Sequence, residues 1–407
     1  MNEENKISTS SSTPQSNSGI DFSVDSFQQA FGVDFNDTID IDKWNSGFDL
    51  AKFIPKIEED WIKVKSRQSS NQKTIRESFF PRIKELARVP HAGLCENVSE
   101  IKDLVEKVQK GFLFNGAVTA CASTIASYQT VPLTISQIGV CLINYERQSG
   151  TYTHTLIRSP ELRYENSDSL KNLVNLFERR KNEDDGQNKE RKMSEIAVRG
   201  IRAYMERLLL LERKNEKSKW ILGNGEPMPH ELMRGFWAGK REQSEKSLGL
   251  IKKIVEHQRF VYVQGCEKFE DLWMFGDALL PFEYLVIDSL ENILTQRIIS
   301  GNIRPPIRDD YMNFAKEIGS KIVQGIYRVS SQGEPQIFYG HIDHIRTAAL
   351  VAMADSIFQL YRGRPMLLDL ASNICQMSFN QNDLVSTIHQ ASIRAEKKLR
   401  ITADFKH

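Results

Sequence analysis

Polar residues that could do chemistry stand where three apolar, strand-like stretches begin or end. Asn115-Gly116 opens the first stretch, Asn224-Gly225 closes the second, and His341-Ile342-Asp343-His344 ends the third. His341 and Asp343 are two residues apart, so they would share one face of a strand and could bind a metal ion with the second histidine. Ordinary structure is the alternative, because Asn-Gly is a common tight-turn dipeptide and such groups also make hydrogen bonds at strand ends.

Two groups of cations could contact a phosphate backbone. Arg364 stands in the run Gly363-Arg364-Pro365, and a basic cluster lies near the end of the sequence. Lysine and arginine supply the sequence-independent part of DNA binding, although a solvated helix end is the default explanation of the cluster. The cluster consists of Lys397, Lys398, Arg400 and Lys406.

Absent motifs and the charge balance narrow the class of protein. The sequence has no GxxxxGKS or GxxxxGKT loop, no GxGxxG after a strand, no HExxH and no GxSxG. These absences argue against P-loop ATPases, dinucleotide enzymes, zincins and serine hydrolases. The 54 lysines and arginines nearly balance the 53 aspartates and glutamates, for a formal net charge of +1. Nucleic-acid binding would therefore depend on a local basic patch.

Cysteine usage and hydropathy indicate a cytoplasmic protein without membrane attachment. The five cysteines are scattered and form no CxxC pair, which argues against a disulfide framework or a zinc site and favours a reducing compartment. The sequence does not open with a basic and apolar leader. No apolar run is long enough to span a bilayer.

The spacing of apolar residues predicts the elements that must position these groups. Residues 1–20 are rich in Ser, Asn and Thr and are predicted to be a disordered tail. Residues 21–110 are predicted to form a helical region, with helices over 27–31, 48–64, 75–87 and 98–109. One face of the second of these helices carries Phe53, Ile54, Ile57, Trp61 and Ile62.

From residue 111 to residue 407 the pattern is a mixture of strands and helices. Residues 111–145 and 151–157 predict an antiparallel meander, and the charged block 178–192 predicts an exposed insertion. The whole indicates an α/β protein in which one mixed sheet is flanked by helices. Further helices are predicted over 194–211, 244–256, 347–361 and 383–400, and strands over 220–222, 260–264, 284–288, 322–329 and 336–342.

Taken in chain order, these motifs resemble those of the NurA nuclease family. Asn115-Gly116 stands where family members carry an Asp-Gly pair on their first strand. Glu206 matches an acidic residue on a helix, and Asn224-Gly225 matches a second Asp-Gly pair at a strand end. The stretch from His341 to Ile345 loosely matches an R-x-E-x-P strand end.

The resemblance continues to the end of the sequence. In GRPMLLDLAS, Arg364 stands at a tyrosine position and Ser372 at a histidine position of the family's last motif. The stretch from Phe379 to Lys406 resembles the closing helix of the family with its basic end. The match runs roughly from Phe112 to the C-terminus.

The resemblance implies an RNase H-like core, a homodimer, manganese-dependent cleavage of DNA strands and partnership with a HerA-type hexameric ATPase in DNA repair or defence. Such hydrolysis uses two divalent cations, Mn²⁺ or Mg²⁺, about 4 Å apart, and hard cations need several carboxylate ligands. Hydrolysis is therefore expected to be impaired, because only one of the family's five site positions keeps its residue type. Those positions are Asn115, Glu206, Asn224, Arg364 and Ser372, of which Glu206 is unchanged in type.

Three hypotheses follow. The favoured one is a pseudoenzyme that binds DNA or the HerA-type ATPase as a scaffold, because Arg364 adds a positive charge where a metal would sit. The second is an active manganese-dependent DNA exo- or endonuclease, and the third is a dimeric interaction protein unrelated to DNA. For Glu206 the ordinary alternative is a solvated charge, and for Glu226 it is a turn. An active enzyme would need a metal site rebuilt from Glu206, Glu226, His341 and Asp343.

Overall fold

The computed structural model divides into two compact units, Met1–Arg67 and Gln68–His407. The structure describes residues 24–44, 50–85, 93–94, 98–129, 133–158, 186–214, 216–233, 241–267, 269–300 and 307–394.

The described part of the first unit is helical, as the sequence predicts. Asp34 and Asp40 each begin a short helix by accepting a hydrogen bond from a backbone N–H two residues on. The apolar face predicted for the long helix is exposed, since Ile54 is 49%, Trp61 58% and Ile62 70% exposed. The elements are α1 (Val24–Phe31), α2 (Phe35–Ile39), η1 (Ile41–Lys43) and α3 (Leu50–Thr74), which continues into the second unit.

The second unit is built on one mixed sheet, which has nine strands among the described residues, in the order β1-β7-β8-β9-β6-β5-β2-β3-β4. β2, β3 and β4 form the antiparallel meander that the sequence predicts. β5 pairs parallel with β2 and β6 pairs parallel with β5, whereas the strands beyond β6 are antiparallel. The strands are β1 (Gly93–Leu94), β2 (Val118–Gln129), β3 (Thr134–Ile143), β4 (Gln148–Arg158), β5 (Trp220–Asn224), β6 (Phe260–Gly265), β7 (Glu283–Ser289), β8 (Ile322–Arg328) and β9 (Gln336–His341).

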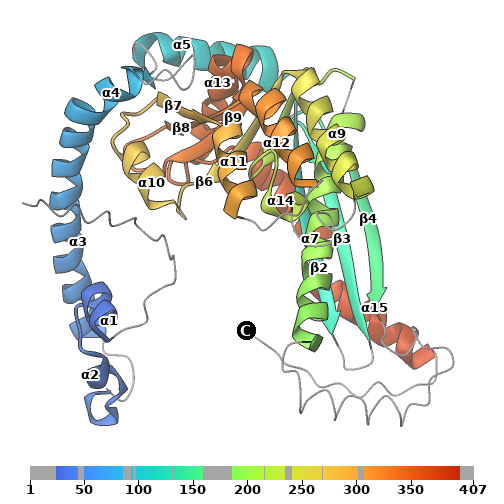
Figure 1. Cartoon of the computed structure of the whole chain (residues 1–407), viewed down its shortest axis with the longest axis horizontal. Coiled ribbons are helices and arrows are strands. Elements are labelled where there is room, and N and C mark those ends of the chain that lie inside the picture. The colour runs from blue at the N-terminus through green and yellow to red at the C-terminus, as the bar shows by residue number, and fades with distance from the viewer. Residues whose placement is uncertain are drawn as a thin grey trace, which may run out of the picture. The chain divides into compact units, whose positions relative to one another are not determined.

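Helices cover both faces of this sheet (Figure 1). Successive side chains of a strand point to opposite faces, so Ile221 of β5 belongs to one hydrophobic cluster whereas Trp220 and Leu222 belong to another. The first cluster includes residues of α7 (Gly186–Glu212), α8 (His230–Met233), α9 (Arg241–His257), α10 (Glu270–Asp277), α11 (Leu290–Ser300) and α12 (Ile307–Glu317). The second includes residues of α5 (Val98–Val108), α13 (Ile345–Ser356) and α14 (Met366–Ser378).

Shorter segments complete the unit. A 3-10 turn, η6, leads from β9 into α13, and another, η7, follows α13. The final helix packs at the β2–β3 hairpin, where Leu384 joins Ala126, Tyr128 and Ile135. The bounds are η2 (Ile75–Phe79), α4 (Phe80–Glu85), η3 (Gln109–Leu113), η5 (Gly319–Lys321), η6 (Ile342–His344), η7 (Ile357–Gln359) and α15 (Gln381–Arg394).

The unit boundary differs from the one that the sequence predicts between residues 110 and 111. Ile101, Val105 and Val108 of α5 are buried in the second hydrophobic cluster, so this helix belongs to the sheet unit. α7 begins at Gly186 and therefore includes the last part of the charged block 178–192. The predicted tail and the rest of that block lie outside the described residues, and α10, α11, α12 and α14 were not predicted.

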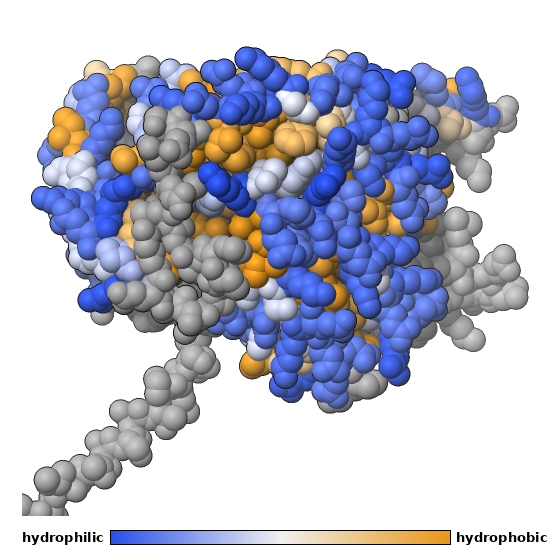
Figure 2. All heavy atoms as spheres, turned by 90° about the horizontal axis from the view of Figure 1, so that it is seen from above, coloured by the Kyte–Doolittle hydropathy of each residue, from blue (hydrophilic) through white to orange (hydrophobic). Residues whose placement is uncertain are grey.

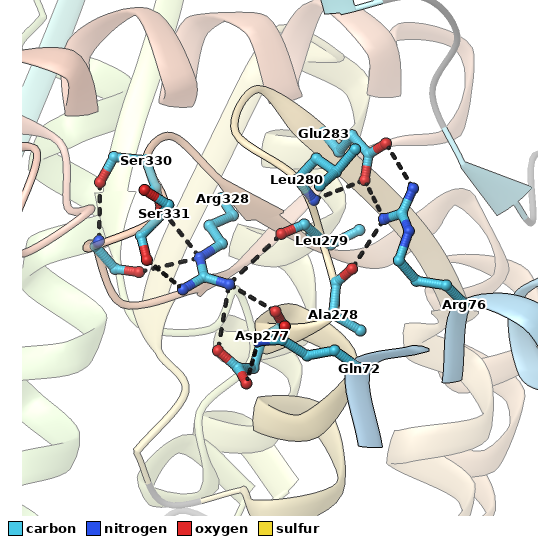
Figure 3. A network of polar contacts seen from close by, with 11 residues as sticks. Gln72, Arg76, Asp277, Ala278, Leu279, Leu280, Glu283, Arg328, Ser330 and Ser331 are labelled. Carbon is cyan, nitrogen blue, oxygen red and sulfur yellow. Dashed lines mark hydrogen bonds and ion pairs between the residues drawn. The ribbon is translucent and has the colours of Figure 1, made fainter. Parts of the chain in front are cut away.

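Polar contacts join the helical run before β1 to the end of the sheet (Figure 3). Arg76, in the π-helical segment η2, donates two hydrogen bonds to Glu283 at the start of β7, at 2.7 and 3.1 Å. Gln72 donates to Asp277 at 2.8 Å, and Asp277 also pairs with Arg328 of β8 at 3.2 Å. Because the carboxylates are nearly buried, these charge-assisted bonds fix where the helical run meets the sheet.

The face of the molecule seen from above carries mainly hydrophilic residues, with hydrophobic ones gathered towards its middle (Figure 2). Within the part of the chain that the structure describes, no helix combines the length and the apolar character needed to cross a membrane.

Candidate functional site

Glu206 lies buried between α7 and β2. The residue is 6% exposed, and its Oε2 accepts a hydrogen bond from Ser123 Oγ of β2 at 3.1 Å. Arg207 Nη1 lies 4.0 Å from the same oxygen. The sequence-based alternative of a solvated charge is therefore wrong, because α7 turns this residue towards the sheet.

The Glu206 carboxyl is only partly satisfied within the protein. Burial raises its pKa, and the cations of Arg207, Arg202 and Arg364 and the Ser123 hydrogen bond oppose that rise. Glu206 Oε1 and the nearby Arg202 Nε are buried and have no hydrogen-bond partner among the described residues. Such buried atoms cost about 1–3 kcal/mol each when no partner satisfies them, so a water, an ion or a ligand is needed to complete their hydrogen bonds.

Arg207 forms hydrogen bonds to the loop that follows β5. Its guanidinium is 2% exposed and donates to the backbone oxygens of Ala203 (2.8 Å), Pro227 (2.7 Å) and Glu226. It also stacks over the ring of Tyr262, 5.3 Å from the centroid. The end of β5 is thereby held beside the α7 helix that carries Glu206.

The two Asn-Gly pairs have different roles in the structure. Asn115 completes a turn before β2, since it donates to Gly111 O at 2.6 Å and accepts from Ala117 N at 3.1 Å. Asn224 ends β5, and its Oδ1 accepts a hydrogen bond from Arg364 Nη2 at 3.2 Å. Both glycines have positive φ, as a turn requires, but only Asn224 also contacts another predicted site residue.

Arg364 connects Asn224 to α14. Besides the bond to Asn224, its Nε lies 3.4 Å from Asp369 Oδ1, and Arg362 Nη1 donates to the other oxygen of that carboxylate at 2.5 Å. The Asp369 side chain is 10% exposed and that of Arg364 is 33% exposed. Asp369 is therefore neutralised by two arginines, one of which faces solvent.

A buried carboxyl supports the start of α14. Asp355 of α13 is fully buried, and its Oδ2 accepts a hydrogen bond from Leu367 N at 2.8 Å. Its Oδ1 accepts from Tyr145 Oη at 2.5 Å. Burial raises the pKa of Asp355 to about 7 despite these two bonds.

The predicted metal-binding residues do not form one site. His341 is 4% exposed and its Nδ1 accepts from Asp343 N at 3.2 Å, within the turn η6. Glu226 is bound by Arg297 Nη1 at 2.6 Å. Among the described residues no three His, Cys, Asp or Glu side chains converge as metal ligands, so a site rebuilt from Glu206, Glu226, His341 and Asp343 stays a prediction.

The residues at the site also do not fit two divalent cations. Glu206 is the one carboxylate there that keeps an unpaired oxygen, and it stands beside Arg207 and within the field of Arg364. Asp369 already carries two guanidinium partners. Divalent ions need several carboxylates that are free to bind them, and this arrangement supplies cations in their place.

Other predicted residues stand apart from these contacts. Ser372 is half-buried on α14, three residues after Asp369. The basic cluster lies outside the described residues, in the stretch 395–407. Its members are Lys397, Lys398, Arg400 and Lys406.

The structure adds three residues that sequence reasoning missed. Ser123 contacts Glu206 because α7 packs against β2. No local pattern distinguishes Ser123 from its neighbours in this strand. Asp369 and Arg207 directly adjoin motifs that the resemblance uses, so their charge was a signal that could have been followed.

The arrangement of β2–β3–β4, α7, β5, α9 and β6 is that of an RNase H-like α/β core, as the resemblance implies. The chain is similar to the solved NurA nuclease from Sulfolobus solfataricus, at 9% identity and a TM-score of 0.41, over 85% of this chain and 99% of that chain. A NurA structure with manganese is 9% identical, with a TM-score of 0.44, and the match covers 84% of this chain and 99% of that chain. Endonuclease V from Bacillus subtilis is 10% identical, with a TM-score of 0.28, and the match covers 73% of this chain and 95% of that chain.

No protein-family model and no curated protein matches the sequence. Identities and TM-scores at this level describe a distant likeness of fold alone. The chemistry of the site therefore rests on the side chains of this chain.

Proposed function

We propose that this chain binds DNA at the Glu206–Arg364 site and does not hydrolyse it. The observation that carries the proposal is the position of Arg364, which bridges Asn224 and Asp369 and lies within electrostatic reach of the Glu206 carboxyl. A guanidinium is a planar donor suited to two phosphate oxygens at once. The motif order that resembles NurA supports DNA as the ligand.

The charges of the site explain why binding and hydrolysis separate. Two divalent cations would add four positive charges to a site that already contains Arg207, Arg362 and Arg364. The local carboxylates, Glu206 and Asp369, are too few to offset that sum. A phosphate backbone, in contrast, brings the negative charge that the site lacks.

The resemblance extends the proposal to partners and place. A homodimer that works with a HerA-type hexameric ATPase in DNA repair or defence would use this chain as a DNA-holding scaffold. The four described cysteines are free and buried, which is compatible with a reducing cytoplasm. Light scattering and copurification with such an ATPase test these points independently of DNA binding.

The first experiment measures cleavage of linear and single-stranded DNA with Mn²⁺ or Mg²⁺, for the wild-type protein and for Glu206→Gln. We expect no cleavage by either protein. Cleavage that is present in the wild type and lost in Glu206→Gln would refute the proposal and establish an active nuclease.

The second experiment measures DNA binding by fluorescence anisotropy for Arg364→Ala. Loss of a charge-assisted phosphate contact is expected to weaken binding about 10- to 100-fold and to reduce the dependence of log K on log salt by about one unit. Arg308→Ala is the matched control, because Arg308 is exposed on α12, which packs on the face of the sheet opposite to α14. Equal binding by both variants would contradict the proposal.

A further inference from the structure

Aromatic and arginine side chains alternate in the segment between α13 and α14. Phe358 is 44% exposed, Tyr361 is 75% exposed and the Arg362 side chain is 73% exposed. Arg364 follows two residues later and belongs to the site described above. Exposed aromatic rings interleaved with cations are the combination that single-stranded nucleic acids bind.

A third aromatic residue reaches this segment from another part of the chain. Phe114, in the turn before β2, is 50% exposed, and its ring centroid lies 5.9 Å from that of Phe358. Tyr145 packs against both rings, at 5.6 and 6.2 Å. Such tilted and edge-on packing holds the rings in place, yet about half of each phenylalanine remains open to solvent.

The backbone of the segment is fixed before any ligand arrives. Leu360 O accepts a hydrogen bond from Ser330 Oγ at 2.7 Å, and Arg362 O accepts from Gln336 Nε2 at 3.0 Å. Gly363 N donates to Gln359 O at 2.8 Å. A ligand that binds to the side chains of this segment therefore does not have to order its backbone, which favours affinity.

One buried carboxyl joins the aromatic rings to the phosphate site. Asp355 accepts hydrogen bonds from Tyr145 Oη beneath the rings and from Leu367 N at the start of α14. Arg364 lies three residues before Leu367, directly before the N-cap residue of α14. The rings and Arg364 are thus parts of one connected structure.

We infer that Phe114, Phe358, Tyr361 and Arg362 form an aromatic–arginine surface that binds an unpaired DNA strand leading to Arg364. The inference rests on the proposed function and specifies the form of DNA. Bases of a duplex have their faces covered by stacking, whereas those of a single strand are free to stack on the exposed rings. Stacking of this kind tolerates any sequence, because every base has a π-face.

The test compares binding of a single-stranded oligothymidylate, a duplex of equal length and an abasic strand, each longer than the roughly 4–16 nucleotides of comparable sites. Replacing Phe114 and Phe358 by leucine retains apolar volume but removes the aromatic faces. We expect single-strand binding to fall about tenfold or more for each ring removed. Duplex and abasic binding and the salt dependence are expected to stay within about twofold.

Phe79→Leu is the matched control, because Phe79 is a comparably exposed phenylalanine (47%) outside this surface. Unchanged single-strand binding by the leucine variants would overturn the inference, and so would an equal loss on duplex and single strand. In both cases sensitivity to Arg364→Ala would leave the proposed function standing. If neither form of DNA bound to the wild type, both proposals would fail and the surface would belong to a protein partner.

Discussion

Replacing Asp355 by asparagine tests the buried support of α14. The folded protein raises the pKa of this carboxyl from 3.8 to about 7 through burial. Between those pH values the folded state binds more protons than the unfolded state, so stability must fall as the pH rises. The contribution of Asp355 is present in full below its unfolded pKa and is lost as the pH rises through 7.

The size of the effect follows from the same shift. From about pH 5 to pH 8, ionisation of Asp355 in the folded state is expected to cost roughly 3 kcal/mol of unfolding free energy. Asparagine cannot ionise, and it can keep both contacts, because its oxygen can accept from Leu367 N and its amide can donate to Tyr145 Oη. Alanine keeps neither contact and is expected to leave the protein about 3–5 kcal/mol less stable than asparagine does, at all pH values.

The measurement is urea unfolding of the wild type, Asp355→Asn and Asp355→Ala at several pH values. The Asp355→Asn variant is the internal reference, because it retains every other titrating group, including Glu206. As the pH rises, the unfolding free energy of the wild type should fall relative to that of Asp355→Asn. A difference that is constant with pH, or that moves the other way, would refute the assignment of this pH dependence to Asp355.

Two further predictions concern other parts of the second unit. The Arg76→Ala variant removes the partner of the nearly buried Glu283 and is expected to lower the unfolding free energy by about 2–4 kcal/mol. The control Glu77→Ala, in the same π-helical segment, should change it by less than about 0.5 kcal/mol. Equal effects of the two variants in urea unfolding would contradict the role of this contact. Asn115→Ala is expected to lower stability by about 1 kcal/mol without altering DNA binding, because its bonds stay within a turn. Asn224→Ala is expected to weaken DNA binding severalfold through Arg364. If fluorescence anisotropy showed that Asn115→Ala weakens DNA binding more than Asn224→Ala does, these separate roles of the two asparagines would be refuted.

The sequence predicted the sheet better than the helices around it. Strands of the meander and the two parallel strands carry dense apolar runs, such as Phe260–Val263, which are buried on both faces and have few alternatives to a strand. The helices α10 to α12 were missed because each is short, and their spacing is interrupted by loops. The sequence assigns α5 to the helical region because it resembles any amphipathic helix until Ile101 and Val105 are seen against the sheet.

The candidate site was predictable in its motifs and not in its contacts. Asn115-Gly116 and Asn224-Gly225 are the same dipeptide, and both make the turn that the dipeptide favours. What distinguishes them is the arrival of Arg364 beside Asn224, which depends on the packing of α14 against the sheet. For Glu206, burial and the contact to Ser123 likewise depend on two elements more than eighty residues apart in the chain.

The distribution of counter-charges is the physical basis of the proposed binding without hydrolysis. Glu206 has Arg207 beside it, Glu226 has Arg297, and Asp369 has both Arg362 and Arg364. Asp355 balances its own charge by taking up a proton near neutral pH. Each of these carboxyls is thus neutralised within the protein, which leaves little negative charge to attract a metal ion. The exposed charge beside Asp369 is that of Arg362 and Arg364, which is the basis for proposing an anionic ligand.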